Sequence, residues 1–189
     1  MVKSILLVGV GGQGTILTSK ILSAGLVELG FDVKMSEIHG MSQRGGSVST
    51  QIRYGDKVYS PSIGAGEADA MVAFEKVEAA RWLAYLNRGG TLIVNDQEVY
   101  PLPVLIEKEK YPSDVLEALK STVENVKVVA ASSIASGLGN ARAQNIVLLG
   151  ALVNALGLKD LDWERLVREH LPPRLHDLNV KALQAGLSL

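Results

Sequence analysis

Residues 4–14 read Ser4-Ile-Leu-Leu-Val-Gly-Val-Gly-Gly-Gln-Gly14, and this stretch decides the fold class. Its first half is a short, continuous apolar run that ends in glycine, which is typical of a strand buried on both faces of a parallel sheet. Its second half matches G-x-G-x-x-G between a predicted strand and a predicted helix. Such glycines permit a tight turn, let backbone N–H groups approach a phosphate, and place that phosphate at the positive end of the helix.

The residues that follow complete a first structural unit. Apolar residues recur at helical spacing from Thr15 to Leu29, and Gly30 stands where a helix would end. Residues 31–38 then read as a second strand, so the opening segment of about 38 residues predicts a right-handed βαβ unit.

The rest of the chain continues the alternation with one interruption. Residues 47–53 alternate in polarity, and a turn-like segment separates them from Val58 and Tyr59, so we expect a β-hairpin there. Further strands are predicted at 70–74, 91–94 and 126–130, and further helices at 77–86, 113–121, 141–156, 163–170 and 178–185. The expected fold is therefore α/β: one domain, 1–189, with a Rossmann-like, mostly parallel sheet, an inserted hairpin and a helical C-terminal subregion.

Composition narrows the functional classes. Nineteen Lys and Arg residues balance 20 Asp and Glu residues, so the net charge of −1 gives no reason to expect nucleic acid as a partner. The chain has no cysteine and cannot by itself ligate an iron–sulfur cluster. The longest nearly apolar stretch, about 13 residues, is shorter than the roughly 20 that span a bilayer, so no membrane segment is expected. These features favour a cytoplasmic protein.

The glycine loop is the first candidate site. Its backbone and side chains predict ligand or phosphate contacts at Gly9, Gly11, Gly12, Gln13 and Gly14. A tight turn that binds nothing is the alternative. A nicotinamide dinucleotide would also need an acidic residue at the end of the second strand, for which Glu37 is the candidate. Glu37 is not followed by a helix, however, which weakens the dinucleotide interpretation.

The second candidate site follows Glu37 directly, in the segment Ile38-His-Gly-Met-Ser-Gln-Arg-Gly-Gly46. Arg44 can donate two hydrogen bonds to a phosphate, Ser42 and Gln43 add neutral donors, and Gly45 keeps the backbone bare. Parallel strands bring their carboxyl ends to one edge, so this segment should lie near the glycine loop. Arg44 could equally be a surface arginine, and His39 a hydrogen-bonded structural imidazole.

Polar residues after later strands are weaker candidates. Asn95 and Asp96 follow the strand at 91–94 and could orient a ligand at the same edge, although Asn-Asp after a strand is also ordinary turn chemistry. Asn140 is expected to cap a helix, and Arg142 could face either solvent or the loop cluster.

Two linked motifs give the chain a family resemblance. The glycine loop 9–14 is followed by His39-Gly-Met-Ser-Gln-Arg-Gly-Gly-Ser47 before an alternating strand, and residues 179–186 close the pattern. With these motifs the sequence resembles the gamma-type subunit of the 2-oxoacid:ferredoxin oxidoreductases over essentially its whole length. Within that family it is most similar to the beta subunit of the indolepyruvate enzyme, because the pyruvate type tends to carry Glu-Arg-Arg-Gly where this chain has Ser42-Gln-Arg-Gly45.

The resemblance implies a supporting role in a larger enzyme. The family reaction is oxidative decarboxylation of a 2-oxoacid, here indolepyruvate or another arylpyruvate, to an acyl-coenzyme A. The resemblance also implies a larger catalytic partner subunit, which holds thiamine diphosphate, Mg²⁺ and 4Fe-4S clusters and passes electrons to ferredoxin. It also implies that the open sheet edge of this chain contributes to the active-site wall or to the coenzyme A site, with no cofactor bound by this chain alone.

Two other functional classes also fit these residues. A free-standing NAD(P)-dependent oxidoreductase would use the glycine loop and Glu37, although it would lack an obvious acid–base pair beyond His39. A non-catalytic nucleotide-binding regulator would use the same loops without chemistry.

Overall fold

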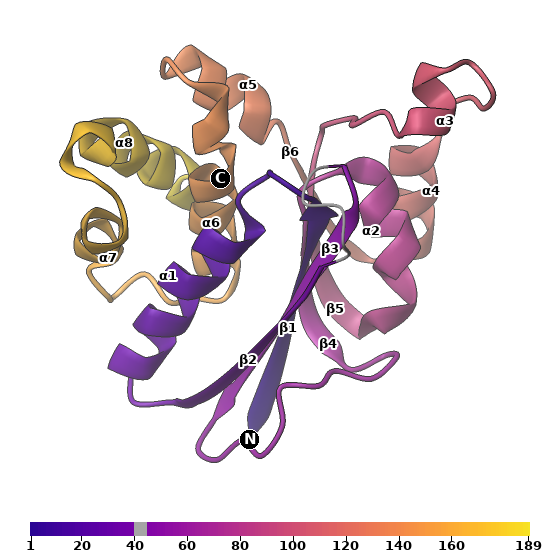
Figure 1. Cartoon of the computed structure of the whole chain (residues 1–189). Helices are drawn as coiled ribbons and strands as arrows, with labels where there is room; N and C mark the ends of the chain where they lie inside the picture. Colours follow the sequence, from indigo (N-terminus) through magenta and orange to yellow (C-terminus); the bar gives the residue numbers. More distant parts are fainter. Residues whose placement is uncertain (40–44) are drawn as a thin grey trace.

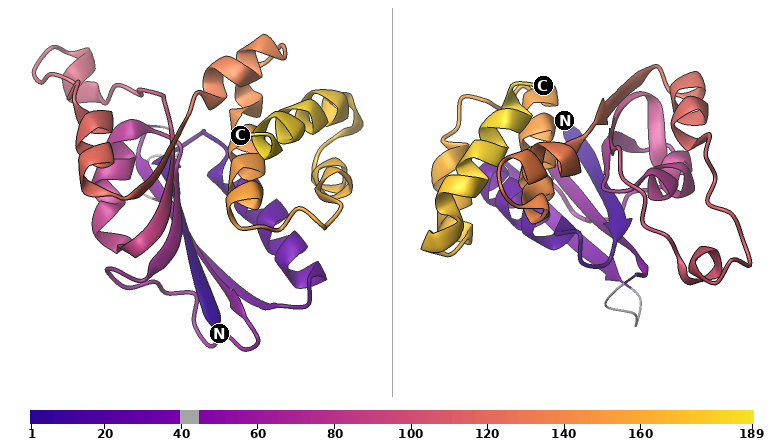
Figure 2. Two further views of the ribbon diagram at one scale, coloured as in Figure 1. Left: turned by 180° about the vertical axis from the view of Figure 1, so that it is seen from behind. Right: turned by 90° about the horizontal axis from the view of Figure 1, so that it is seen from above.

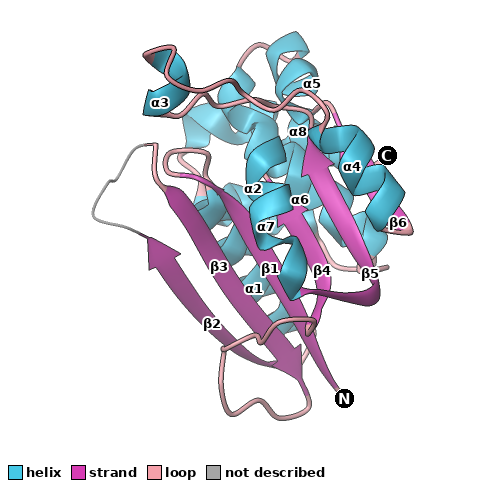
Figure 3. Cartoon of the chain, turned by 90° about the vertical axis from the view of Figure 1, so that its right-hand side faces the viewer, coloured by secondary structure: helices cyan, strands magenta, loops and turns pink. Residues whose placement is uncertain are grey.

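A six-stranded sheet with the strand order β2-β3-β1-β4-β5-β6 organises the fold. The computed structural model describes residues 1–39 and 45–189. The strands are β1 (Val2–Val10), β2 (Asp32–His39), β3 (Ser47–Gly55), β4 (Ala68–Ala73), β5 (Leu86–Asn95) and β6 (Asn125–Val129). Figure 3 shows β2 and β6 at the two edges of this sheet.

Five strands run in one direction and β3 runs against them. β1 pairs in parallel with β4, β4 with β5, and β5 with β6. β3 is antiparallel to both of its neighbours, β1 and β2. The predicted mostly parallel α/β sheet is therefore confirmed, and the antiparallel interruption lies between β1 and β2.

The composition of the hairpin differs from the prediction. Its second strand was expected at Val58 and Tyr59, but the hairpin consists of β2 and β3, and those two residues belong to no strand. The N–H of Val58 is instead bonded to the Asp32 carboxylate at 2.9 Å, which fixes this segment as a loop. Consequently β1 and β2 of the predicted βαβ unit are parallel but not adjacent, because β3 lies between them.

Helices cover both faces of the sheet, as Figures 1 and 2 show. One face is covered by α1 (Thr15–Glu28), α6 (Gln144–Ala155), α7 (Trp163–His170) and α8 (His176–Leu187). The other carries α2 (Lys76–Trp82) and α4 (Val115–Thr122). Shorter helices are α3 (Leu102–Leu105), α5 (Ala131–Gly137) and the 3₁₀ turns 83–85, 141–143 and 173–175. No helix in the described ranges is both long and apolar enough to cross a membrane.

The central strand β1 explains the two-sided core. Ile5 and Leu7 point into a cluster that includes α1 and α6, whereas Leu6 and Val8 point into a cluster on the α2 side. All four side chains are fully buried. A strand buried on both faces needs a continuous apolar run because successive side chains alternate between faces.

The helical C-terminal subregion matches the prediction in its three long helices. α6 and α8 cross closely at two glycines: a Cβ on Gly186 would lie 2.1 Å from the carbonyl oxygen of Val147. α7 contributes Trp163, which packs against Gly25 of α1, where an added Cβ would lie 2.4 Å from the indole ring. Sequence reasoning missed α5, because its sequence ASSIASG has no clear apolar periodicity.

Candidate functional site

The glycine loop joins β1 to α1 at the carboxyl edge of the parallel strands. Gly12 and Gly14 have φ angles of 100° and 86°, a region that favours glycine. A Cβ on Gly14 would also lie 2.6 Å from the Asn145 side-chain nitrogen, so this position needs glycine for both reasons. Gly14 is the N-cap of α1, and no side chain of residues 1–39 and 45–189 caps the helix. The first N–H groups of α1 therefore have no intrahelical partner and form a positive end.

Gln13 fixes the shape of this loop. Its Oε1 accepts a hydrogen bond from the N–H of Val10 at 2.7 Å. Its Nε2 donates to the carbonyl of Phe74 and to the Gln97 side chain, each at 3.0 Å. Gly9 leaves room for this arrangement, because a Cβ there would lie 2.8 Å from Gln13 Oε1. The side chain of Gln13 thus holds the loop, which leaves the backbone of Gly12 and Gly14 as the surface for a ligand.

A pocket of about 580 Å³ opens beside the loop, between α1 and the ends of β2 and β3. Most of its lining is apolar, and it includes the side chains of Ile16, Leu17 and Val48. The backbone of Gly11, Gly12 and Gly14 forms one end, and Lys20 and Glu37 contribute charged groups. This pocket, which we call the loop pocket, is the first candidate binding site.

Glu37 gives the loop pocket a polar feature. It lies opposite Thr50 in the register of β2 and β3, so both side chains share the face covered by α1. Its Oε1 is buried and has no hydrogen-bond partner within residues 1–39 and 45–189. A buried carboxylate oxygen without a donor attracts one strongly. The pocket therefore combines an uncapped helix N-terminus with an acceptor, a pair that fits a ligand with an anionic group and a hydroxyl or amine.

The second predicted site lies partly outside the described residues. Ser42, Gln43 and Arg44 belong to the range that the structure does not describe, and so does the side chain of His39. Gly45 has a φ angle of 80°, and the carbonyl of Gly46 accepts a hydrogen bond from the N–H of Gly11 at 2.9 Å. This bond joins the two motifs at the same edge of the sheet.

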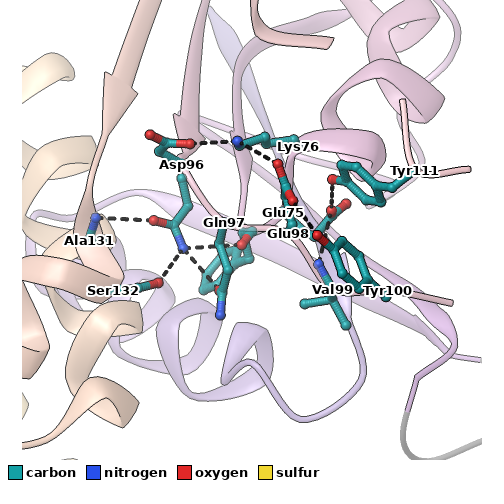
Figure 4. A network of polar contacts seen from close by, with 12 residues as sticks. Glu75, Lys76, Asp96, Gln97, Glu98, Val99, Tyr100, Tyr111, Ala131 and Ser132 are labelled. Atoms are coloured by element: carbon teal, nitrogen blue, oxygen red, sulfur yellow. Dashed lines mark hydrogen bonds and ion pairs between the residues drawn. The ribbon is translucent and has the colours of Figure 1, made fainter. Parts of the chain in front are cut away.

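Asn95 lies inside this edge and not on its surface. The residue is fully buried, and its Nδ2 donates to the carbonyl of Phe74 at 3.2 Å and to Gln144 Oε1 at 2.9 Å. Its Oδ1 accepts from the N–H of Ala131 at 3.1 Å. Its Nδ2 also donates to the Ser132 hydroxyl at 3.3 Å, and Figure 4 shows Ala131 and Ser132 within this network of polar contacts. In this structure Asn95 braces the loops after β4, β5 and β6 and has no exposed atom for a ligand.

The other weak candidates lie on the surface. Asp96 forms an ion pair with Lys76 at 2.7 Å. Asn140 caps a 3₁₀ turn by accepting from the N–H of Arg142 at 3.0 Å, as predicted, and Arg142 is exposed. Within the described ranges, no three His, Cys, Asp or Glu side chains come together as a metal site.

Sequence reasoning missed a buried carboxylate on the α2 side. Glu75 is 1% exposed and accepts hydrogen bonds from the N–H of Glu78 at 2.9 Å, from the N–H of Val99 at 3.3 Å and from the Tyr111 hydroxyl. Burial and this hydrogen bond raise the pKa of Tyr111 well above its ordinary value. Glu75 belongs to no motif, and only its place just before a helix gives a weak capping signal.

Comparison with known proteins identifies the family. The model of the family described as pyruvate ferredoxin/flavodoxin oxidoreductase matches residues 4–189. The chain belongs to this oxidoreductase family. Indolepyruvate oxidoreductase subunit IorB of Pyrococcus horikoshii is 38% identical over 191 residues, covering 97% of this chain and 94% of the relative. The protein of the same name from Archaeoglobus fulgidus is also 38% identical, covering 97% and 92%.

Solved structures share the fold of this oxidoreductase family member. The gamma subunit of a keto/oxoacid ferredoxin oxidoreductase from Geobacter sulfurreducens superposes with a TM-score of 0.72 at 24% identity, covering 98% of this chain and 96% of that one. The 2-oxoglutarate:ferredoxin oxidoreductase of Magnetococcus marinus gives 0.75 at 17% identity, with 99% of this chain matching 30% of that longer chain. The family resemblance inferred from the two motifs is confirmed.

Proposed function

We propose that this chain is the cysteine-free smaller subunit of an indolepyruvate-type 2-oxoacid:ferredoxin oxidoreductase. The assembled enzyme would convert an arylpyruvate and coenzyme A to an aryl-acetyl-coenzyme A, CO₂ and a proton, and two electrons would leave to ferredoxin. The main support for this proposal is the 38% sequence identity to subunits named indolepyruvate oxidoreductase, which extends over nearly the whole of this chain and of each relative. Subunits named 2-oxoglutarate synthase and pyruvate/ketoisovalerate oxidoreductase are only 28% identical.

The residues of the chain support a non-autonomous role. No cysteine is available to ligate the iron–sulfur clusters that carry electrons to ferredoxin. The diphosphate-binding pattern of the family's cofactor chain, Gly-Asp-Gly followed by an Asn pair, is also missing, because Gly55-Asp56 continues with Lys57. Thiamine diphosphate, Mg²⁺ and the clusters would therefore be held by the larger partner subunit, which supplies the carbanion and electron-transfer chemistry.

The contribution of this chain would be part of the coenzyme A site at the carboxyl edge of its sheet. The loop pocket offers the N-terminus of α1 and the bare backbone of Gly12 and Gly14 to a phosphate, and Glu37 to a hydroxyl or amine. Arg44, with Ser42, Gln43 and Gly45, would add a charged contact from the second motif, which is joined to the glycine loop through Gly46.

A free-standing NAD(P)-dependent oxidoreductase and a nucleotide-binding regulator are the alternatives. Both could use the glycine loop and Glu37, which line one pocket. A dinucleotide fold, however, places its acidic residue on the strand next to β1. Here β3 occupies that place and Glu37 lies one strand further out. The family assignment and this strand order favour the subunit role.

The test is purification of the complex with this chain as bait. Native mass spectrometry should show a larger partner, and metal and cofactor analysis should find iron and thiamine diphosphate with that partner. The chain purified alone should bind no iron and should oxidise no 2-oxoacid with any acceptor, and adding the partner should restore turnover. Turnover by the rigorously purified chain, or a complex without iron and thiamine diphosphate, would contradict the proposal.

A further inference from the structure

The segment 97–112, which we call the arm, leaves the end of β5 and projects from the carboxyl edge with α3 at its tip (Figure 1). Both ends of the arm are tied to one carboxylate, because Glu75 accepts hydrogen bonds from the N–H of Val99 and from the Tyr111 hydroxyl. The rings of Tyr100 and Tyr111 lie 5.2 Å apart and close the base of the arm (Figure 4). The arm is thus a projection with a fixed base.

The tip of the arm is apolar and exposed. Leu102 is 68% exposed and Leu105 is 63% exposed, and the adjacent Tyr100 and Ile106 are about half exposed. Four large, exposed apolar side chains therefore lie within seven residues of the chain, and clustered exposed apolar residues usually mark sites of protein–protein contact.

A groove of about 660 Å³ runs between the arm and α2. Its apolar lining comes from Val77 on α2 and from the arm, including Val99, Leu102 and Leu105. The groove also reaches Gly45 and Ser47, beside the second motif. An occupant of the groove would therefore lie against the same sheet edge as the glycine loop.

Arg81 gives the groove a positive charge that a neighbouring carboxylate holds in place. Its Nε donates to the Glu78 carboxylate at 3.0 Å, and that carboxylate also accepts from the Ser47 hydroxyl. Glu78 is 5% exposed, whereas the side chain of Arg81 is 58% exposed. Within the described part of the chain, the two terminal nitrogens of Arg81 have no partner. The buried Glu78 thus orients a guanidinium whose outer edge faces the groove.

Four other charged side chains line the groove: Glu75, Glu78, Glu109 and Lys110. Glu75 and Glu78 are buried and hydrogen-bonded, whereas Glu109 and Lys110 are exposed and form no ion pair with described residues. Arg81 is the cation that a neighbouring carboxylate holds in place, so the occupant that fits it is an apolar segment that carries one carboxylate, placed to accept two hydrogen bonds from Arg81.

We propose that the arm and this groove are the docking surface for the larger catalytic subunit, which inserts such a segment. This inference rests on the proposed function. A second copy of the chain would cover the arm without completing a catalytic site, whereas the larger subunit would close the edge that carries both ligand motifs. In the Magnetococcus marinus enzyme the same fold is 30% of one longer chain, so a permanent contact with the remaining enzyme suits this fold.

Site-directed crosslinking tests the proposal, because the natural chain has no cysteine and each introduced thiol is unique. A benzophenone–maleimide probe is attached to Leu105→Cys in this chain purified alone, before the larger subunit with its own cysteines is added. Tyr59→Cys, 88% exposed in the loop after β3, is the matched control. Illumination should link position 105, and not position 59, to the larger subunit. Links from position 105 to a second copy of this chain, or to nothing, would overturn the proposal.

Affinity measurements test the role of Arg81. Arg81→Ala should weaken binding of the larger subunit at least about tenfold, and Arg81→Lys should recover only part of that loss, because an ammonium lacks the forked geometry. Arg88→Ala, an exposed arginine near the start of β5, should bind normally. Equal affinities for the Arg81 and Arg88 variants would refute the carboxylate contact. If the wild-type chain binds no larger subunit at all, the proposed function is wrong. If the wild-type chain binds it and the Arg81 variants bind equally well, only the docking surface is wrong.

Discussion

The Tyr111 hydroxyl donates a hydrogen bond to the buried carboxylate of Glu75, across 36 positions of sequence. Within residues 1–39 and 45–189, Glu75 has no cationic partner and is satisfied by neutral donors, two from the backbone and one from this hydroxyl. Removing a donor from a buried carboxylate leaves part of its charge unsatisfied, so the pair links the stability of the domain to the position of the arm.

Tyr111→Phe should lower the free energy of unfolding by about 1.5–3 kcal/mol near neutral pH, the typical value of a hydrogen bond to a charged group. The pKa of Tyr111 is raised from its ordinary value of 10.0 in the folded chain. The unfolded chain therefore releases this proton first, and wild type loses the extra stability as the pH rises above about 10. Urea denaturation of both proteins should show a difference that shrinks with rising pH, and a difference that grows above pH 10 would contradict the assignment.

Asn95→Ala should destabilise the chain by about 2–4 kcal/mol, because it leaves the buried N–H of Ala131 without its acceptor and removes the hydrogen bonds from Asn95 to the Phe74 carbonyl and to Gln144. The control is Asp96→Ala, which removes only a surface ion pair with Lys76 and should cost less than about 1 kcal/mol. Thermal unfolding at one fixed protein concentration compares them. If the Asn95 variant keeps its stability and loses coenzyme affinity in the complex, Asn95 contacts the ligand after all.

Gly186→Ala should separate α6 and α8. The added Cβ would lie 2.1 Å from the carbonyl oxygen of Val147 and 2.9 Å from Cα of Gly150, both backbone atoms that cannot turn away. We expect a loss of about 1–3 kcal/mol in the free energy of unfolding. Gly137→Ala in α5 meets nothing within 4 Å and should be neutral or slightly stabilising. Equal stabilities of the two variants would show that the helices do not pack this closely.

Arg44→Ala in the assembled enzyme should weaken coenzyme A binding by about 1.5–3 kcal/mol, the value of a hydrogen bond to a charged group, with almost no change in stability. Arg44→Lys should rescue it only partly, because it restores charge without the fork. Isothermal titration with the complex measures both. A variant that fails to assemble while its residual enzyme keeps a normal KM for coenzyme A would instead make Arg44 an interface residue.

The sequence predicts where the strands and helices lie better than it predicts which strands are neighbours in the sheet. A continuous apolar run locates β1, because a strand buried on two faces needs one. The helical spacing of apolar residues locates α1, because a helix packs with one apolar face. The place of β3 between β1 and β2 leaves no such pattern, since alternation identifies a strand but not its neighbours. Glycine spacing located the loop that lines the loop pocket, and the side-chain period of strands puts Glu37 on the same face as Thr50.

The polar contacts were harder to predict, because they join residues that no motif connects. Gln13 and Asn95 look like ligand residues from their positions after β1 and β5, yet both amides are taken up by neighbouring loops. Glu75, Val99 and Tyr111 meet only because the arm returns to its starting point. Residue type and order alone do not distinguish an amide that braces a loop from one that faces a ligand.

The antiparallel strand in the middle of the sheet sets an order of assembly during synthesis. β2 and β3 are joined by a short connection, so their hairpin can close locally and early. Every pair between β1 and β3 is more distant, from Val10 with Ser47 to Val2 with Gly55. The strand β1, in which seven of nine residues are buried, is made first and paired late, because both of its neighbours follow it in the chain. A nascent chain stalled before residue 47 would expose β1 with no partner on either side, and ribosome-bound truncations ending there should be the most prone to aggregate.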